Sequence, residues 1–162
     1  MNVRIEERPT FKVVGVKEEI SLKDGANLLE IPKFWERVNL DGTANKISDL
    51  SHGELGGLVG ICTNMRDQRM DYWIGVATTE ATPLEFEEVV IEAQIWAVFE
   101  VVGPLPTAIQ AAWKFVFSEW LPHSDYLHAE GPEVEWYSIG NPTAENYVSE
   151  IWIPIMMKEA TN

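Results

Sequence analysis

Short runs of β-branched and aromatic residues alternate with turn-forming segments along this chain, a pattern typical of short β-strands. Gly15 interrupts one of the longer runs and predicts a β-bulge there. The polar segments 41–57 and 123–131 are interpreted as loops. The pattern predicts strands over residues 3–7, 11–22, 58–64, 71–78, 89–93, 95–102, 133–138 and 148–157.

Two stretches instead have the spacing of amphipathic helices. The first follows the turn residues 24–27, and a longer one begins near Thr107 and ends at Pro122. Strands and helices together predict an α+β fold, with an antiparallel sheet and helices packed on it. The apolar positions that define the two helical stripes are Ile31, Phe34, Trp35 and Val38 in the first, and Ile109, Ala112, Trp113, Val116, Phe117 and Trp120 in the second.

The closing strand contains the sequence Ser149-Glu-Ile-Trp-Ile-Pro-Ile155. Side chains alternate between the faces of a strand, so the isoleucines share a core face, while Glu150 and Trp152 share the other. The stretch Asp71-Tyr-Trp-Ile-Gly-Val76 has the same order of acid, bulky residue, Trp and Ile, about half the chain earlier. We therefore expect one domain over residues 1–162, built from two strand-helix-strand-strand repeats of about residues 1–82 and 83–162.

Charge narrows the possible partners. The chain has 12 Lys and Arg against 26 Asp and Glu, a net charge of −14, which argues against binding nucleic acid or an anionic membrane and favours cationic ligands. Cys62 is the single cysteine, so an internal disulfide is excluded, and we expect it to be a buried inert thiol. The N-terminus has no signal-peptide pattern, and we therefore expect a cytoplasmic protein. We expect no cofactor and no metal, because phosphate-loop motifs are absent and His123 and His128 lack a third ligand at metal spacing.

Five stretches, taken in order, carry a resemblance to a known family: residues 72–77, 96–99 with 103–104, 117–122, 135–137 and 149–154. Together they resemble the GyrI-like domains, the effector-binding modules of AraC-type and MerR-type multidrug regulators, here in stand-alone form. The resemblance implies two pseudo-symmetric repeats with a ligand cleft between them. It also implies a ligand-binding carboxylate on the last strand, matching Glu150 with Trp152 beside it, and a Glu-x-Tyr strand, matching Glu135 and Tyr137.

The first functional hypothesis is a module that senses or sequesters an amphipathic, aromatic, cationic small molecule in an apolar cleft. Glu150 would be its counter-charge, since a carboxylate beside an indole suits a cation. The expected aromatic contacts are Trp152, Trp73, Trp136, Tyr137 and Trp35, with core packing as the alternative for each.

A second hypothesis, also implied by the resemblance, is a hydrolase that opens cyclopropane-type natural products. In that case Glu150 would act as general acid or base, and Tyr137 would stabilise developing negative charge. A third is inhibition of a DNA-acting enzyme by contact between the two proteins, for which the acidity provides a rationale.

Overall fold

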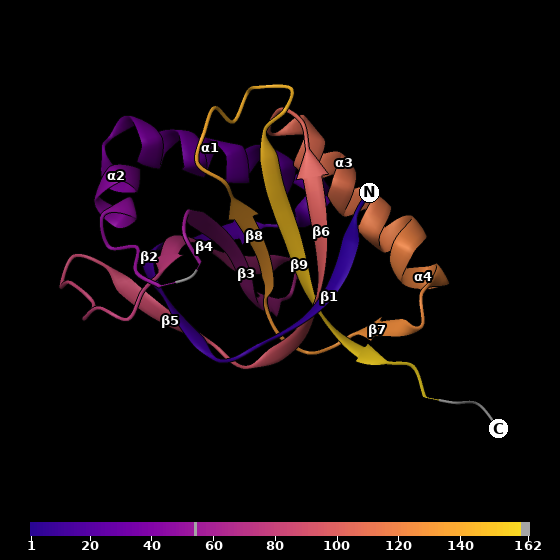
Figure 1. Ribbon diagram of the computed structural model, residues 1–162. Helices are drawn as coiled ribbons and strands as arrows, with labels where there is room; N and C mark the ends of the chain where they lie inside the picture. Colours follow the sequence, from indigo (N-terminus) through magenta and orange to yellow (C-terminus); the bar gives the residue numbers. More distant parts are fainter. Residues whose placement is uncertain (54, 160–162) are drawn as a thin grey trace.

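The computed structural model describes residues 1–53 and 55–159, which form an antiparallel sheet with helices on it. The strand order is β1-β6-β9-β8-β3-β4-β2-β5, and β7 pairs with β9. The α+β prediction is confirmed (Figure 1). The elements are β1 (Val3–Arg8), β2 (Phe11–Ser21), the 3-10 turn η1 (Lys23–Gly25), α1 (Asn27–Leu40), α2 (Thr43–Ser48), β3 (Leu58–Arg66), β4 (Arg69–Ala77), β5 (Glu87–Ile91), β6 (Gln94–Val102), α3 (Thr107–Phe115), the π-helical turn η2 (Val116–Trp120), α4 (Leu121–His123), β7 (Tyr126–His128), β8 (Glu133–Tyr137) and β9 (Val148–Met157).

Each half of the chain supplies a strand, a helix and two further strands. These are β2-α1-β3-β4 in the first half and β6-α3-β8-β9 in the second, and the halves join where β3 pairs with β8. The connectivity follows the expected repeat, whereas the pseudo-symmetry of the two halves stays a prediction. At the outer edges of the sheet, β1 pairs with β6 and β5 pairs with β2.

Both faces of the sheet are buried. On one face α3 packs against Ile151 and Ile153 of β9, and α1 packs against Tyr72 and Ile74 of β4. The other face holds a separate apolar cluster that contains Trp152. Phe11 of β2 lies 6.4 Å from Trp152, between ring centroids, although three strands separate β2 from β9 in the sheet. In a flat sheet that separation would be roughly 19 Å, so the sheet curls around this cluster.

The predicted bulge at Gly15 is wrong. The register between β2 and β4 runs unbroken through this position, where Gly15 lies opposite Gly75. A Cβ atom on Gly15 would lie 2.0 Å from the carbonyl oxygen of Ile74. Glycine is therefore required here for close approach of two backbones, which is the other common reason for glycine in a strand.

Two segments interpreted as loops contain regular structure. Within 41–57, α2 forms over Thr43–Ser48 and buries Ala44 and Ile47; residue 54 of that segment lies outside the described residues. Within 123–131, the three-residue strand β7 pairs with the end of β9. Both elements are too short to give a clear periodic pattern in the sequence, and they form because of their tertiary contacts. No helix in the described part of the chain is long and apolar enough to cross a membrane.

Candidate ligand-binding site

A cavity of about 1560 Å³ is lined by residues of the helices α1 and α3 and of the central strands β3 and β8. Most of its wall is apolar and comes from both halves of the chain. Gln110 of α3 donates a hydrogen bond to the Leu28 carbonyl of α1 at 3.1 Å, which connects the two helices. Such a space, with a few polar groups in it, is typical of a small-molecule site. The residues used below that line it are Trp35, Cys62, Trp113, Phe117, Glu133, Glu135 and Tyr137.

Glu135 is a buried carboxylate in the wall of this cavity, with 5% of its surface exposed. The Tyr72 hydroxyl donates to its Oε1 at 2.5 Å, and the Trp113 indole N–H donates to its Oε2 at 2.9 Å. Trp35 in turn donates from its indole N–H to the Tyr72 oxygen at 2.9 Å. Side chains from α1, β4 and α3 therefore fix the orientation of this carboxyl group on β8.

Burial raises the pKa of Glu135 above its usual range, while hydrogen bonds from Trp113, Tyr72 and Tyr137 oppose this effect. None of the ion pairs among the described residues includes Glu135. Within the described part of the chain, its charge is thus stabilised by neutral donors. A carboxylate in this condition favours the approach of a cation, because the cation offsets the cost of its desolvation.

The backbone beneath this carboxylate is glycine. A Cβ atom on Gly60 of β3 would lie 2.0 Å from the Tyr72 hydroxyl oxygen and 2.9 Å from Glu135 Oε1. Gly60 is paired with Glu135 on one side and with Ile74 on the other. The missing side chain is what leaves room for the buried hydrogen bond.

Aromatic rings form much of the wall beside Glu135. The rings of Trp35 and Tyr137 meet edge to face, with centroids 4.8 Å apart. Trp113 and Phe117 stack nearly parallel at 5.8 Å. Ring faces carry negative charge density, so these side chains and Glu135 present a surface that suits an aromatic cation.

Of the predicted site residues, Trp35 and Tyr137 line the cavity, whereas Glu150 and Trp152 do not. Trp152 is fully buried in the cluster on the opposite face of the sheet. The predicted pairing of acid and indole is present there, since Trp152 donates from its indole N–H to Glu150 Oε1 at 3.0 Å. Arg4 forms an ion pair with Glu150 at 2.9 Å, and the Arg8 guanidinium lies 4.6 Å from the Trp152 ring centroid. Two arginines of β1 therefore supply the positive charge here, Arg4 beside the carboxylate and Arg8 beside the indole.

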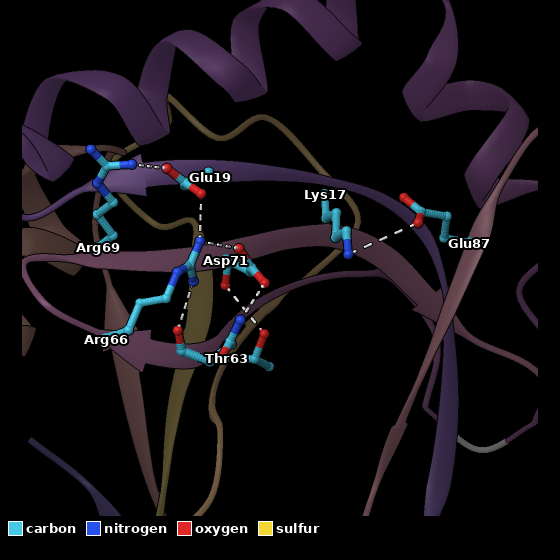
Figure 2. A network of polar contacts seen from close by, with 8 residues as sticks. Lys17, Glu19, Thr63, Arg66, Arg69, Asp71 and Glu87 are labelled. Carbon is cyan, nitrogen blue, oxygen red and sulfur yellow. Dashed lines mark hydrogen bonds and ion pairs between the residues drawn. The ribbon is translucent and has the colours of Figure 1, made fainter.

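In the matching motif of the first half, residues 71–76, the acid and the indole also each have a positively charged neighbour. Arg66 contacts Asp71 at 3.2 Å and also Glu19, in the network that Figure 2 shows on the sheet. Lys17 lies 5.5 Å from the centroid of Trp73, a buried member of the opposite-face cluster.

Trp136 also lies outside the cavity lining, packed against the opposite-face cluster, and donates from its indole N–H to the Gly56 carbonyl at 2.5 Å. The structure does not bring Glu150 and Tyr137 together as one catalytic pair. Trp136 lies directly across from Glu150, and its neighbour Tyr137 therefore points to the other face. A role of Glu150, Trp152, Trp73 or Trp136 in ligand binding stays a prediction, without support from the cavity.

Sequence reasoning did not place Tyr72 or Trp113 in the site, and it named Glu135 only as a match to the Glu-x-Tyr strand of the family, not as a site residue. A usable signal was present, because Glu135 and Tyr137 are two positions apart on one strand and so share a face.

Cys62 lines the cavity as well, and burial together with nearby carboxylates raises the pKa of its thiol well above the usual value. This favours the neutral thiol over the reactive thiolate. Within the described residues, no three His, Cys, Asp or Glu side chains are grouped to hold a metal ion.

Comparison with known proteins places this architecture among small-molecule-binding domains. The family model of the GyrI-like small molecule binding domain matches residues 1–156. SAV2435, solved bound to tetraphenylphosphonium, is 25% identical, with a TM-score of 0.87 over 96% of this chain and 94% of that one. A putative transcription regulation protein from Staphylococcus aureus MU50 is 26% identical, with a TM-score of 0.84 over 96% and 98% of the two chains.

The C-terminal domain of EcmrR has the same fold at 15% identity, with a TM-score of 0.63 over 97% of this chain and 98% of that one. A comparison with curated proteins gives no match.

Proposed function

The chain belongs to the GyrI-like small-molecule-binding domains, and on this basis we propose that its cavity binds a lipophilic aromatic cation with Glu135 as the counter-charge. Trp35, Trp113 and Tyr137 would contact the aromatic groups of the ligand. Binding of this kind serves sensing or sequestration of the ligand. The proposal moves the predicted counter-charge from Glu150 to Glu135.

One observation carries the proposal: a buried carboxylate lies among aromatic rings in a large cavity, and none of the described ion pairs neutralises it. Glu150, by contrast, already has Arg4 as a partner. The tetraphenylphosphonium bound by SAV2435 belongs to the ligand class that such a cavity suits, a delocalised cation enclosed by phenyl groups. Such a cation is weakly hydrated, so the free energy of moving it from water into an apolar cavity is small.

The expected contribution of Glu135 follows from the local environment. A cation near the carboxylate gains Coulomb attraction in a site shielded from water, and each indole face adds about 0.5–2 kcal/mol. Glutamine at position 135 keeps the size of the side chain but removes its charge. We therefore expect Glu135→Gln to weaken binding of a monovalent cation about tenfold or more, which is about 1.4 kcal/mol or more.

The test is calorimetric titration of tetraphenylphosphonium into the wild type, Glu135→Gln and Glu150→Gln. Glu150→Gln is the matched control, because it makes the same chemical change on the opposite face of the sheet. Triphenylphosphine oxide supplies three of the four phenyl groups without the charge and should bind much more weakly. Circular dichroism of each variant separates lost binding from lost folding.

Two results would refute the proposal. One is equal binding of tetraphenylphosphonium by wild type and Glu135→Gln with both proteins folded. The other is a loss of tetraphenylphosphonium binding in Glu150→Gln but not in Glu135→Gln, which would identify Glu150 of the closing strand as the counter-charge.

A second candidate function is hydrolysis of an electrophilic small molecule. It is favoured by the position of Glu135, a carboxyl group with a raised pKa beside the hydroxyl of Tyr72 in a cavity. Such a group can act as a general acid or a general base. Release of a ring-opened product from a cyclopropane-containing aromatic compound, abolished in Glu135→Gln, would establish this activity.

A further inference from the structure

Glu133 is a second carboxylate in the same cavity wall. It precedes Glu135 by two positions on β8, so both side chains point to the same face, with Cα atoms roughly 7 Å apart. The two groups differ in their partners. Among the described residues, the groups that donate to Glu135 are neutral, whereas Glu133 Oε2 lies 3.1 Å from Nε2 of His128.

The hydrogen bonds of His128 show which form of its ring this pair requires. Its Nδ1 lies 2.6 Å from the carbonyl oxygen of Ala129, which can only accept a hydrogen bond. Its Nε2 faces the carboxylate of Glu133, which when ionised is also only an acceptor. Both ring nitrogens must therefore donate, and the geometry corresponds to an imidazolium paired with a carboxylate. The bond to Glu133 accordingly raises the pKa of His128.

His128 is also attached to the cavity through aromatic contacts. Its ring stacks on Phe117 with centroids 6.1 Å apart, and Phe117 stacks on Trp113, which donates to Glu135. One column of rings thus connects the partners of both carboxylates.

The ion pair of His128 among the described residues is with Glu133. Glu133 of β8 faces it directly, η2 presents the uncharged ring of Phe117, and β9 places Ile155 opposite it. Lys114 of α3 and Glu36 of α1 also line the cavity, and both are exposed to solvent. The proton on His128 therefore decides whether Glu133 adds a net charge to the wall.

We propose that Glu133 forms a second cation subsite in this cavity, which takes the second positive charge of an organic dication in exchange for the proton of His128. The inference rests on the proposed function, with Glu135 receiving the first charge. Protonated His128 neutralises Glu133, and loss of that proton leaves two uncompensated carboxylates on one face of β8. The proton and the second positive charge compete for Glu133, so a dication that binds protein with a protonated His128 must release that proton, whereas no release accompanies binding above the pKa of His128.

Ethidium and propidium form a matched pair of probes. They share one phenanthridinium ring, and propidium carries a second, quaternary ammonium charge on a propyl arm. Above the pKa of His128 we expect the wild type to prefer propidium over ethidium about tenfold, because a second charge pair forms in a shielded site. Below that pKa the preference should largely disappear.

Two variants separate the roles of the pair. Glu133→Gln should remove the preference at every pH while ethidium still binds. His128→Gln cannot carry the proton, so its preference for propidium should be present and independent of pH. Titration calorimetry in two buffers of different ionisation enthalpy measures the released proton in the unmodified protein, so this readout does not depend on a variant that folds.

The outcomes distinguish the two proposals. If ethidium binds in a Glu135-dependent manner while propidium shows neither preference nor proton release, the second subsite is refuted and the proposed function stands. If neither probe nor tetraphenylphosphonium binds, the proposed function fails and this inference fails with it. Proton release on propidium binding, absent for ethidium and absent in Glu133→Gln, supports the exchange.

Discussion

Gly60→Ala provides a direct test of the geometry of the site. The added methyl group would lie 2.0 Å from the Tyr72 hydroxyl oxygen, 2.8 Å from its ring carbon Cζ and 2.9 Å from Glu135 Oε1. The backbone cannot easily shift to relieve this contact, because β3 is hydrogen-bonded to β4 on one side and to β8 on the other. Tyr72 must move instead, and its hydrogen bond to Glu135 must break.

Two costs add to give the expected effect. Overpacking of a buried site costs about 1–3 kcal/mol. Leaving the buried hydroxyl and carboxyl groups without each other costs about 1–3 kcal/mol more. We therefore expect the free energy of unfolding of Gly60→Ala to fall by about 2–6 kcal/mol, a large part of the stability of a typical domain.

Urea unfolding followed by tryptophan fluorescence measures this change. Gly56→Ala is the matched control, because a Cβ atom there meets no other atom within 4 Å. We expect the control to stay within about 0.5 kcal/mol of the wild type. Tyr72→Phe removes the atom in closest contact, so the double variant of positions 60 and 72 should lose less stability than the two single variants added together.

The reasoning fails if Gly60→Ala is as stable as Gly56→Ala and still binds tetraphenylphosphonium normally. That result would mean that Tyr72 and Glu135 do not lie above Gly60 as described. Additive losses in the double variant would likewise exclude the Tyr72 hydroxyl as the source of the cost.

Two further predictions concern charge. Arg4→Met should lower the free energy of unfolding by about 1 kcal/mol in urea denaturation, because Glu150 loses its ion pair while the arginine is partly exposed; cation binding in the cavity should not change. Burial raises the pKa of Glu135, so folding favours its protonated form, and its contribution to stability is present at low pH and lost as pH rises through the raised pKa. The stability of the wild type relative to Glu135→Gln should therefore decline as the pH of urea unfolding is raised from about 4 to about 8, and a relative stability that grows with pH would contradict the assignment.

The sequence predicted most of the framework. Apolar periodicity placed both major helices and most of the strands, because each of these elements is long enough to repeat its period. Its failures were at short or exceptional positions. The helix α2 and the strand β7 are too short for a pattern, and Gly15 permits a bulge and a close backbone approach equally well until its partner, Gly75, is known.

In the candidate site, too, the sequence predicted local features but not tertiary contacts. Alternation in the sequence correctly grouped Glu150 with Trp152 on one face of β9, and it equally groups Glu135 with Tyr137 on one face of β8. It could not say which of these faces meets the cavity, because both faces of this sheet are buried and apolar.

That choice depends on contacts between residues distant in sequence. Arg4 reaches Glu150 from the first strand, and Tyr72 and Trp113 reach Glu135 from another strand and a helix. The sequence by itself determined the two major helices and most of the strands, which side chains share a face, and to which family the fold belongs. Only the tertiary structure decided which carboxylate is neutralised by an arginine and which lies in the cavity without one, because the order of strands and the packing of helices set the distances between charges.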